Sequence, residues 1–344
     1  MSRRLVTWCL ALAFTTLLSP RPIIGQGTGL VRVTPLGSHA GELCVFDRAM
    51  LFEDPTGIRI LYDPGRTVDE NDARLGDVHV MLLSHVHTDH LGDVRPQRGG
   101  GTCAAPANSG ASQNSNFASI AAPKRAVVIA GPDATTFLSN RIQNVRGAAT
   151  PGCPTSGPEN ETIVPTPSVC AAGLNFGSMR LMTRAGAGSV RIAVVPAIHT
   201  NGIPAQYIDS PGLPPGVIPS AGPPVGFVIS FSNGLRAYLT GDTGVTNEMD
   251  MIARLYRPML AVINMNDVNT MAPAEAAFAM QQYIRPVTVM PSHVNEAATN
   301  GGVEVAGSRV DRFIRLVRGF TDVVIPLSDV TRSFDGEGRC VGCR

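Results

Sequence analysis

The sequence predicts a layered domain of mixed α/β structure. Apolar residues make up 44% of the 344-residue chain, enough for a sizeable core, while charged residues contribute only 16%. Short apolar runs with many β-branched residues dominate the pattern, and helical patterns alternate with them only towards the end. This order argues against a helical bundle and against a doubly wound sheet, for which a glycine-rich nucleotide fingerprint is also missing.

The predicted strands follow one another from residue 30 onward. Each is a short apolar run with the length and composition typical of strands. They are residues 30–33, 43–46, 58–62, 78–84, 126–130, 190–196, 226–231, 235–240, 261–264, 287–290 and 322–327.

Three segments have helical spacing instead: residues 246–257, 272–284 and 308–319. Pro273 suits the first turn of the second segment. The third has apolar residues at 310, 313, 314 and 317, which place one apolar face along a helix. These helices are expected to cover a sheet.

Two stretches resemble loop insertions, residues 97–122 and 147–177, and both contain cysteines that favour an ordered structure. A further long loop, residues 201–224, is rich in proline, glycine and apolar residues and directly follows His199. Loops of this length are commonly functional. We expect the loop after His199 to form a wall of the substrate pocket.

Residues 1–27 predict a cleaved export signal. Arg3 and Arg4 precede an apolar run over residues 5–18, and a small-x-small triplet at residues 25–27 offers a cleavage site. The run is too short to span a bilayer comfortably, and an uncleaved anchor is the alternative. We therefore expect one mature domain over residues 28–344 that is periplasmic or secreted, without stable membrane insertion after cleavage.

Net charge argues against a nucleic-acid partner. The whole chain carries +1, and removal of residues 1–27 takes away three arginines, which leaves 25 basic against 27 acidic residues, or about −2. A nucleic-acid-binding domain would need a basic patch or stripe. A small-molecule substrate is expected instead, and the oligomeric state stays open.

Cysteine usage agrees with an oxidising compartment. Cys9 lies in the export signal, and an even set remains: Cys44, Cys103, Cys153, Cys170, Cys340 and Cys343. Structural disulfides are expected, but the pairing does not follow from the sequence. The terminal CVGC has no second pair for a zinc ribbon and no βαβ context for a redox motif.

The stretch LLSHVHTDHLGD, residues 82–93, concentrates three of the seven histidines. His85 and His87 leave the end of a predicted strand on the same side, because side chains alternate along a strand. Asp89 and His90 follow on what should be a tight turn. The H-x-H-x-D-H spacing is highly specific for a metal site, and a run of surface polar residues is the weaker alternative.

Three isolated donors follow other predicted strands. His199 closes VRIAVVPAIH, Asp242 lies in LRAYLTGDTG, and His293 follows VTVMPSH. The ends of strands are where open α/β sheets place their ligands. Together with the four donors of the histidine-rich stretch, these side chains fit two ions better than one tetrahedral zinc, and zinc, manganese or iron would suit nitrogen and oxygen donors.

These segments resemble the metallo-β-lactamase superfamily, and within it the branch of metal-dependent hydrolases related to ascorbate-6-phosphate lactonase. The resemblance covers about residues 37–296, roughly three quarters of the chain. It is carried by ILYDPG, VMLLSHVHTDHLGDV, VVPAIHT, PPVGFVISFSNGLRAYLTGDTG, INMNDVNTMAPAEAA and VTVMPSHVNE.

The resemblance implies a four-layer αββα sandwich with two metal ions at one edge of its sheets. By the family pattern, the first ion would be held by His85, His87 and His199, the second by Asp89, His90 and His293, with Asp242 bridging them. Outside these ligands, Asp63 would support the ligand loop, His39 lies where the branch carries a histidine, and residues 269–271 match a turn beside the site.

The implied activity is hydrolysis of an ester or lactone bond in a small molecule by attack of a metal-bridging hydroxide, with Asp89 or Asp242 passing a proton to the leaving group. On the same site, the alternatives are a β-lactamase, a phosphodiesterase and, least favoured by the charge, an RNA-processing nuclease. A non-catalytic metal-binding module is the alternative from another class. The export signal and extra cysteines differ from the cytoplasmic lactonase relatives and leave the substrate open.

Overall fold

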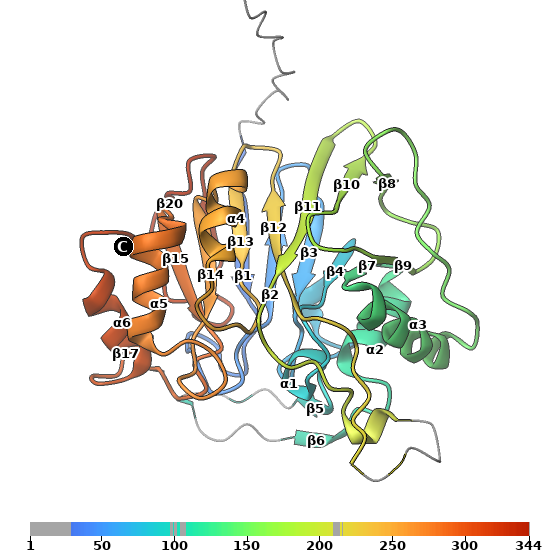
Figure 1. The fold of residues 1–344 in the computed structure, drawn as a ribbon, viewed down its shortest axis with the longest axis horizontal. Coiled ribbons are helices and arrows are strands. Elements are labelled where there is room, and N and C mark those ends of the chain that lie inside the picture. Colours follow the sequence, from blue (N-terminus) through green and yellow to red (C-terminus); the bar gives the residue numbers. More distant parts are fainter. Residues whose placement is uncertain are drawn as a thin grey trace, which may run out of the picture.

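The computed structural model describes residues 29–96, 99, 102–103, 108–208, 214 and 216–343. The predicted export signal lies outside these residues. Two eight-stranded sheets pack face to face, and helices cover both outer faces (Figure 1). The four-layer αββα sandwich is therefore confirmed. In the described part of the chain, no helix is long and apolar enough to cross a membrane.

The first sheet has the strand order β20-β19-β1-β2-β3-β4-β7-β9. Strands β3, β4, β7 and β9 are parallel, so their carboxyl ends share one edge. The strands are β1 (Val31–Pro35), β2 (Met50–Glu53), β3 (Arg59–Tyr62), β4 (Val80–Leu82), β7 (Val127–Ala130), β9 (Cys170–Gly173), β19 (Arg332–Phe334) and β20 (Cys340–Val341).

The second sheet has the order β18-β15-β14-β13-β12-β11-β10-β8. Strands β13, β14 and β15 are parallel, and β11 runs in the same direction because β11 and β13 are both antiparallel to β12. The strands are β8 (Glu161–Ile163), β10 (Met179–Arg184), β11 (Gly188–Pro196), β12 (Val225–Ser230), β13 (Arg236–Leu239), β14 (Leu260–Asn264), β15 (Thr288–Ser292) and β18 (Asp322–Val323).

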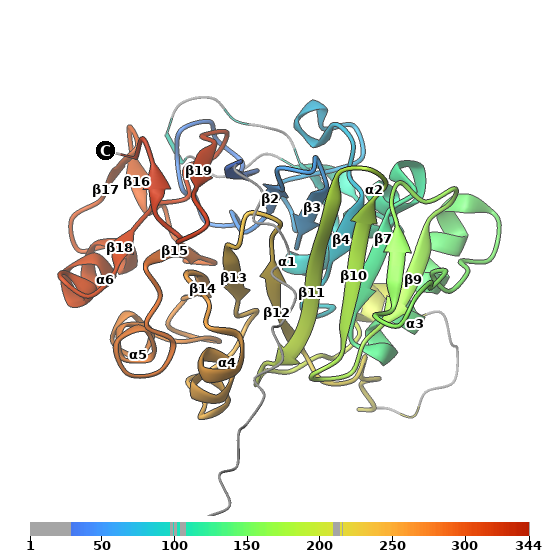
Figure 2. The same ribbon diagram turned by 90° about the horizontal axis from the view of Figure 1, so that it is seen from above.

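The helices fall into two groups on opposite sides of the sheets, as Figure 2 shows from above. The first sheet is covered by α2 (Asn116–Lys124) and α3 (Pro132–Arg146). The second sheet is covered by α4 (Glu248–Tyr256), by α5 (Pro273–Phe278), which continues as a π-helical turn η3 (Ala279–Ile284), and by α6 (Arg309–Val317).

Short elements complete the fold. A one-turn helix, α1 (Thr88–Leu91), lies in the histidine-rich stretch, where the sequence predicted a tight turn. The others are the 3-10 turns η1 (Ala73–Leu75) and η2 (Ala205–Tyr207) and the two-stranded ribbons β5 (Val94–Pro96) with β6 (Asn108–Ala111) and β16 (Thr299–Asn300) with β17 (Val303–Glu304).

Three apolar layers hold the sandwich together. The central layer lies between the sheets, where the rings of Tyr62 and Phe227 meet edge to face at 6.2 Å and those of Phe52 and Phe231 lie 6.1 Å apart. The outer layers lie under the two groups of helices. Each fully buried large apolar side chain stabilises the fold by about 1.5–3 kcal/mol, so the sheets form a rigid base for the loops at their edge.

One predicted strand is wrong. Residues 43–46 form a turn, and the strand that pairs with β1 is β2, a few residues further on. The backbone N–H of Leu43 donates to Thr299 Oγ1, and that of Cys44 donates to Asp47 Oδ2. These amides bond to side chains instead of a neighbouring strand, which is the competition that polar side chains offer to a sheet.

Other boundaries also differ. The predicted strand 322–327 is extended only over β18, because Pro326 has no N–H to pair. Residues 116–122, part of the first predicted insertion, begin helix α2, and residues 147–177 contain β8 and β9, the last strands of the two sheets. The cysteines pair as Cys44–Cys103, Cys153–Cys170 and Cys340–Cys343.

Candidate metal centre

The predicted donors meet at one edge of the sandwich, where loops from both sheets come together. His85 and His87 follow β4 of the first sheet. His199, Asp242 and His293 follow β11, β13 and β15 of the second sheet, whose carboxyl ends share an edge. The two sheets therefore contribute different donors to one site.

The backbone at this edge needs special conformations. Gly241, just before Asp242, has φ +63°, and a Cβ there would lie 2.6 Å from the carbonyl oxygen of Val225. Asp63 and His293 have φ values of 40° and 54°, which non-glycine residues rarely adopt. Such strained residues cluster at functional sites, where the surrounding structure holds them.

Asp242 is the centre of the cluster. Its Oδ2 lies 3.9, 3.4, 3.7 and 3.3 Å from the Nε2 atoms of four histidines, respectively His85, His90, His199 and His293. One carboxylate oxygen is thus shared by histidines from both sheets. This is the arrangement expected of a bridging carboxylate.

The donor atoms form three overlapping groups, each with all its donor atoms within 4.8 Å of one another. One group is His85, His87 and His199, another is Asp89, His90 and His293, and the group between them is His85, His90 and Asp242. All the donors predicted from the sequence belong to these groups. The third group shares His85 with the first and His90 with the second, so the donors form one continuous cluster around Asp242.

Asp63 orients the histidines from outside the cluster. Its Oδ2 accepts from His90 Nδ1 at 2.7 Å and from Ser84 Oγ at 2.6 Å, and its Oδ1 accepts from the Ser84 backbone N–H at 2.8 Å. Ser84 Oγ in turn lies 3.0 Å from Nδ1 of His85. These contacts engage the Nδ1 protons of His85 and His90, so the neutral form of each ring presents an unprotonated Nε2 to the cluster, which is the form that a metal requires.

The surroundings of His90 Nε2 show that this cluster suits a metal ion. Its Nε2 is buried and has no hydrogen-bond partner among the described residues. Burial alone would lower the pKa of His90, but the carboxylates of Asp242, Asp63 and Asp89 raise it to about 10. The surroundings of this buried nitrogen therefore favour a positive charge, and a divalent cation supplies one while accepting its lone pair.

The two acidic donors remain ionised. Burial would raise the pKa of Asp242, but the neighbouring His90 and His293 outweigh it and hold that pKa well below its usual range. Burial opposes the charge on Asp89 as well, and Arg48 and His90 lower its pKa far below normal. The Nη2 atom of Arg48 lies 3.0 Å from Asp89 Oδ2.

The three histidines of the first donor group are neutral. Burial lowers the pKa values of His85, His87 and His199, and neighbouring imidazoles lower them further. His85 Nε2 and His87 Nδ1 lie 3.0 Å apart. Neutral imidazoles that converge in this way are suited to divalent transition metals.

His293 is oriented differently. The side-chain oxygen of Asn266 accepts from the backbone N–H groups of residues 268–270, which turns the Asn266 amide nitrogen towards His293 Nδ1 at 2.8 Å. An imidazole that accepts at Nδ1 carries its proton on Nε2, which lies 3.1 Å from Asp89 Oδ2. His293 must therefore change its Nδ1 contact before it binds an ion, whereas His90 is already in the required tautomer.

His39, the remaining candidate, has other partners. Its Nδ1 lies 3.0 Å from Ser38 Oγ and 3.5 Å from Cys44 Sγ, and its ring packs against Gly99. It belongs to none of the donor groups found among the described residues. Its contacts place it beside the Cys44–Cys103 disulfide.

Sequence reasoning missed several supporting residues. Asn264 donates to Asp242 Oδ1 at 2.7 Å, and Asn266 contacts His293. Both asparagines lie at the end of a predicted strand, the same signal that found His199 and Asp242, so that signal could have found them. Arg48 gave no such signal, because its role depends on a fold that brings it to Asp89.

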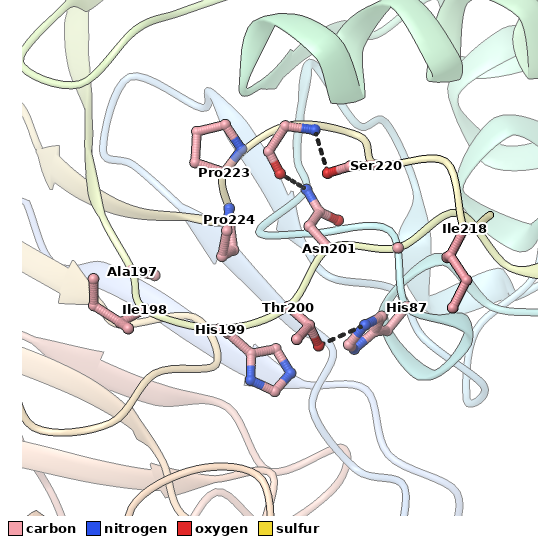
Figure 3. A pocket seen from close by; sticks show the side chains of 12 residues that line it. His87, Ala197, Ile198, His199, Thr200, Asn201, Ile218, Ser220, Pro223 and Pro224 are labelled. Atoms are coloured by element: carbon pink, nitrogen blue, oxygen red, sulfur yellow. Dashed lines mark hydrogen bonds between the residues drawn. The ribbon is translucent and has the colours of Figure 1, made fainter. Parts of the chain in front are cut away.

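A pocket of about 990 Å³ opens beside the first donor group (Figure 3). His87 and His199 lie at one side of it, and the loop after His199 forms its wall, as the sequence predicted. The remaining lining residues are Ala197, Ile198, Thr200, Asn201, Gly202, Ile218, Ser220, Gly222, Pro223 and Pro224.

Comparison with known proteins agrees with this site. No family model matches the chain. It is 25% identical over 267 residues to a UPF0173 metal-dependent hydrolase of Polaromonas sp. strain JS666, covering 77% of this chain and 78% of the relative. It is 27% identical over 292 residues to a UPF0173 metal-dependent hydrolase of Cupriavidus taiwanensis, covering 83% of this chain and 82% of the relative.

The fold resembles that of Igni18, a metallo hydrolase from Ignicoccus hospitalis, with a TM-score of 0.54 and 19% identity over 89% of this chain and 99% of that chain. The fold and the donor set agree with the resemblance to the metallo-β-lactamase superfamily that the sequence motifs predict. In sequence, the chain is similar to proteins named UPF0173 metal-dependent hydrolases. The narrower resemblance to ascorbate-6-phosphate lactonase stays a prediction.

Proposed function

We propose that this enzyme binds two divalent metal ions and hydrolyses an ester or lactone bond of a small molecule. One observation supports this proposal above all others: a single oxygen of Asp242 lies within 4 Å of histidine nitrogens that belong to two separate donor groups. A site for one ion does not need a shared carboxylate of this kind.

The first ion would be held by His85, His87 and His199 and the second by Asp89, His90 and His293, with Asp242 between them. All donors are imidazole nitrogens or carboxylate oxygens, a set that suits zinc above all, and manganese or iron as alternatives. When bound, the ions supply the Lewis acidity that lowers the pKa of a water towards neutrality and stabilises negative charge on the reacting group.

The protein's own groups position the donors and move the protons. Asp63 and Ser84 fix the rings of His85 and His90, and Asn264 fixes the carboxylate of Asp242. Asp89 is a partly exposed donor, and we assign to it the transfer of a proton from the attacking water to the leaving alcohol; its lowered pKa favours release of that proton to the alcohol. Arg48 keeps this carboxylate charged between turnovers.

We further propose that the protein acts outside the cytoplasm. The export signal predicted for residues 1–27 supports this placement, and so do the three disulfides, since such bonds persist in oxidising compartments. The substrate would then be a compound found in the periplasm or the medium.

A substrate panel with measured metal content tests the proposal. Purified protein is assayed on lactones, aryl esters, β-lactams and bis-phosphodiesters, while the metal bound per chain is determined. We expect about two ions per chain and turnover of aryl esters or lactones. Turnover of only β-lactams or phosphodiesters would show that the protein cleaves that bond instead of an ester or lactone. Two bound ions without turnover of any substrate class would indicate a metal-binding module.

A further inference from the structure

Hydrogen bonds of Asn201 connect the wall of the pocket to the loop that carries His85 and His87. Asn201, only 6% exposed, joins its wall to the metal-binding loop: Oδ1 accepts from the backbone N–H of Val86 at 2.8 Å, between His85 and His87. The side-chain amide of Asn201 donates to the carbonyls of Ala221 and Gly222, at 3.2 and 2.9 Å. The two ends of the loop are thus tied to each other and to the donors.

Apart from the neutral imidazoles of His87 and His199, no ionisable side chain lines this pocket among the described residues. The sequence itself contains no lysine or arginine between Arg191 and Arg236, a stretch that includes the whole loop. Two large apolar side chains on the wall are instead open to solvent: Ile198 is 58% and Ile218 is 74% exposed. Exposed apolar side chains at the mouth of a pocket are suited to an apolar group of a ligand.

The positions of the donors indicate which part of the substrate lies in this pocket. Asp89, the proposed proton donor to the leaving group, belongs to the group of His90 and His293. The pocket is lined by His87 and His199, which belong to the other donor group, and its described lining includes neither Asp89 nor His293. The leaving group therefore lies towards Asp89, and the acyl group extends into the pocket.

We propose that this pocket binds an uncharged, apolar acyl chain and selects against an acyl chain that carries an anionic group. An anionic group in the pocket would lose its hydrating water and gain no cationic partner from the wall. Burial of an unpaired charge raises the free energy of the complex, so such a chain should bind more weakly. This inference rests on the proposed ester or lactone hydrolysis and specifies the class of substrate: neutral esters or lactones with an apolar acyl part.

The test compares phenyl hexanoate with monophenyl adipate at pH 7.5 on the metal-loaded enzyme. The two esters share the scissile bond, the leaving group and the chain length, and differ by a terminal carboxylate. We expect kcat/KM to favour phenyl hexanoate at least about tenfold. Ile218→Arg and, separately, Ile198→Arg should reduce that preference about tenfold, while Ile163→Arg, at an exposed position on β8, should leave it unchanged.

A binding measurement separates this inference from the proposed reaction. Hexananilide and adipic acid monoanilide, the corresponding amides, are titrated calorimetrically into the metal-loaded and the metal-free protein. Tighter binding of hexananilide in both states, weakened by Ile218→Arg, supports the pocket assignment even if no ester is hydrolysed. Equal or tighter binding of the carboxylate, or a preference that neither isoleucine variant changes, would overturn it.

Discussion

At the scale of single residues, the site depends on one carboxylate oxygen. Asp242 Oδ2 is the atom that histidines from both sheets share, and Asn264 holds the other oxygen of that carboxylate. Without this group, Asp89 would be the only carboxylate left among the donors, and the charge of the ions would be less well balanced. The remaining donors would then hold metal more weakly.

Replacement of Asp242 by alanine should therefore abolish turnover. Loss of groups that merely support ligands already costs about 10–100-fold in metal affinity or activity, so loss of a bridging ligand should exceed 100-fold. Activity and bound metal per chain are measured together. Asp250→Ala, a comparable change at an ion-paired surface position on α4, serves as the control, and residual turnover equal to that control would refute the bridging role.

A second residue-scale prediction concerns Asn266→Asp. A carboxylate at this position would accept a hydrogen bond from His293 Nδ1–H, as Asp63 does from His90. His293 Nε2 would then be unprotonated and free to bind metal. We expect the weaker of the two metal affinities to rise about tenfold while the stronger one changes little. Titration of metal-free protein with zinc measures both affinities, and an unchanged weaker site would contradict the assigned tautomer.

The donors were predictable from sequence because their signal is local. Four of them lie within residues 85–90, and the other three each follow a strand that composition alone identifies. The supporting role of Arg48 was not predictable, since its ion pair with Asp89 exists only after strands distant in sequence come together. The supporting role predicted for His39 stays a prediction, since its contacts are with Ser38 and Cys44.

At the scale of elements, the loop after His199 acts as a wall only because Asn201 ties its ends together. Asn201→Ala would leave a buried backbone N–H of Val86 and two carbonyls without their partner. Each unsatisfied buried group costs about 1–3 kcal/mol. We expect a lower Tm and a raised KM for phenyl hexanoate, measured by thermal unfolding and steady-state kinetics. The exposed Asn300→Ala should change neither.

Element prediction failed where side chains compete with regular structure. The apolar run at residues 43–46 resembles a strand, yet its amides bond to Thr299 and Asp47. Helix α3 was missed because polar residues are spread along it, and even Arg141 on this helix is buried, so no clean apolar face stands out in the sequence. Long apolar strands gave no such difficulty, because burial on both faces leaves a continuous signal.

At the scale of the whole molecule, bound metal would join the two sheets. His85, His87, Asp89 and His90 belong to the first sheet's loops, and the other donors to the second. A ligand that binds only the folded state stabilises it by about 2.7 kcal/mol when present at 100 times its Kd. Chelation should therefore lower the Tm by several degrees. Calorimetry with and without EDTA measures this shift, and a shift of equal size in Asp242→Ala would show that it has another origin.

The global architecture was predictable in class and not in detail. Composition and run lengths indicated a layered α/β domain, and the resemblance of the motifs supplied the sandwich. The strand order and the cysteine pairing depend on contacts between distant segments, for which a single sequence holds no direct signal.

Disulfide formation and metal binding use different side chains in this protein. The six paired cysteines and the seven metal donors are entirely different residues. Because none of these cysteines is a proposed metal ligand, disulfide formation and metal binding do not compete for the same side chains. A chain that binds ions as proposed would be able to do so before or after its disulfides form, in whichever order its surroundings provide them.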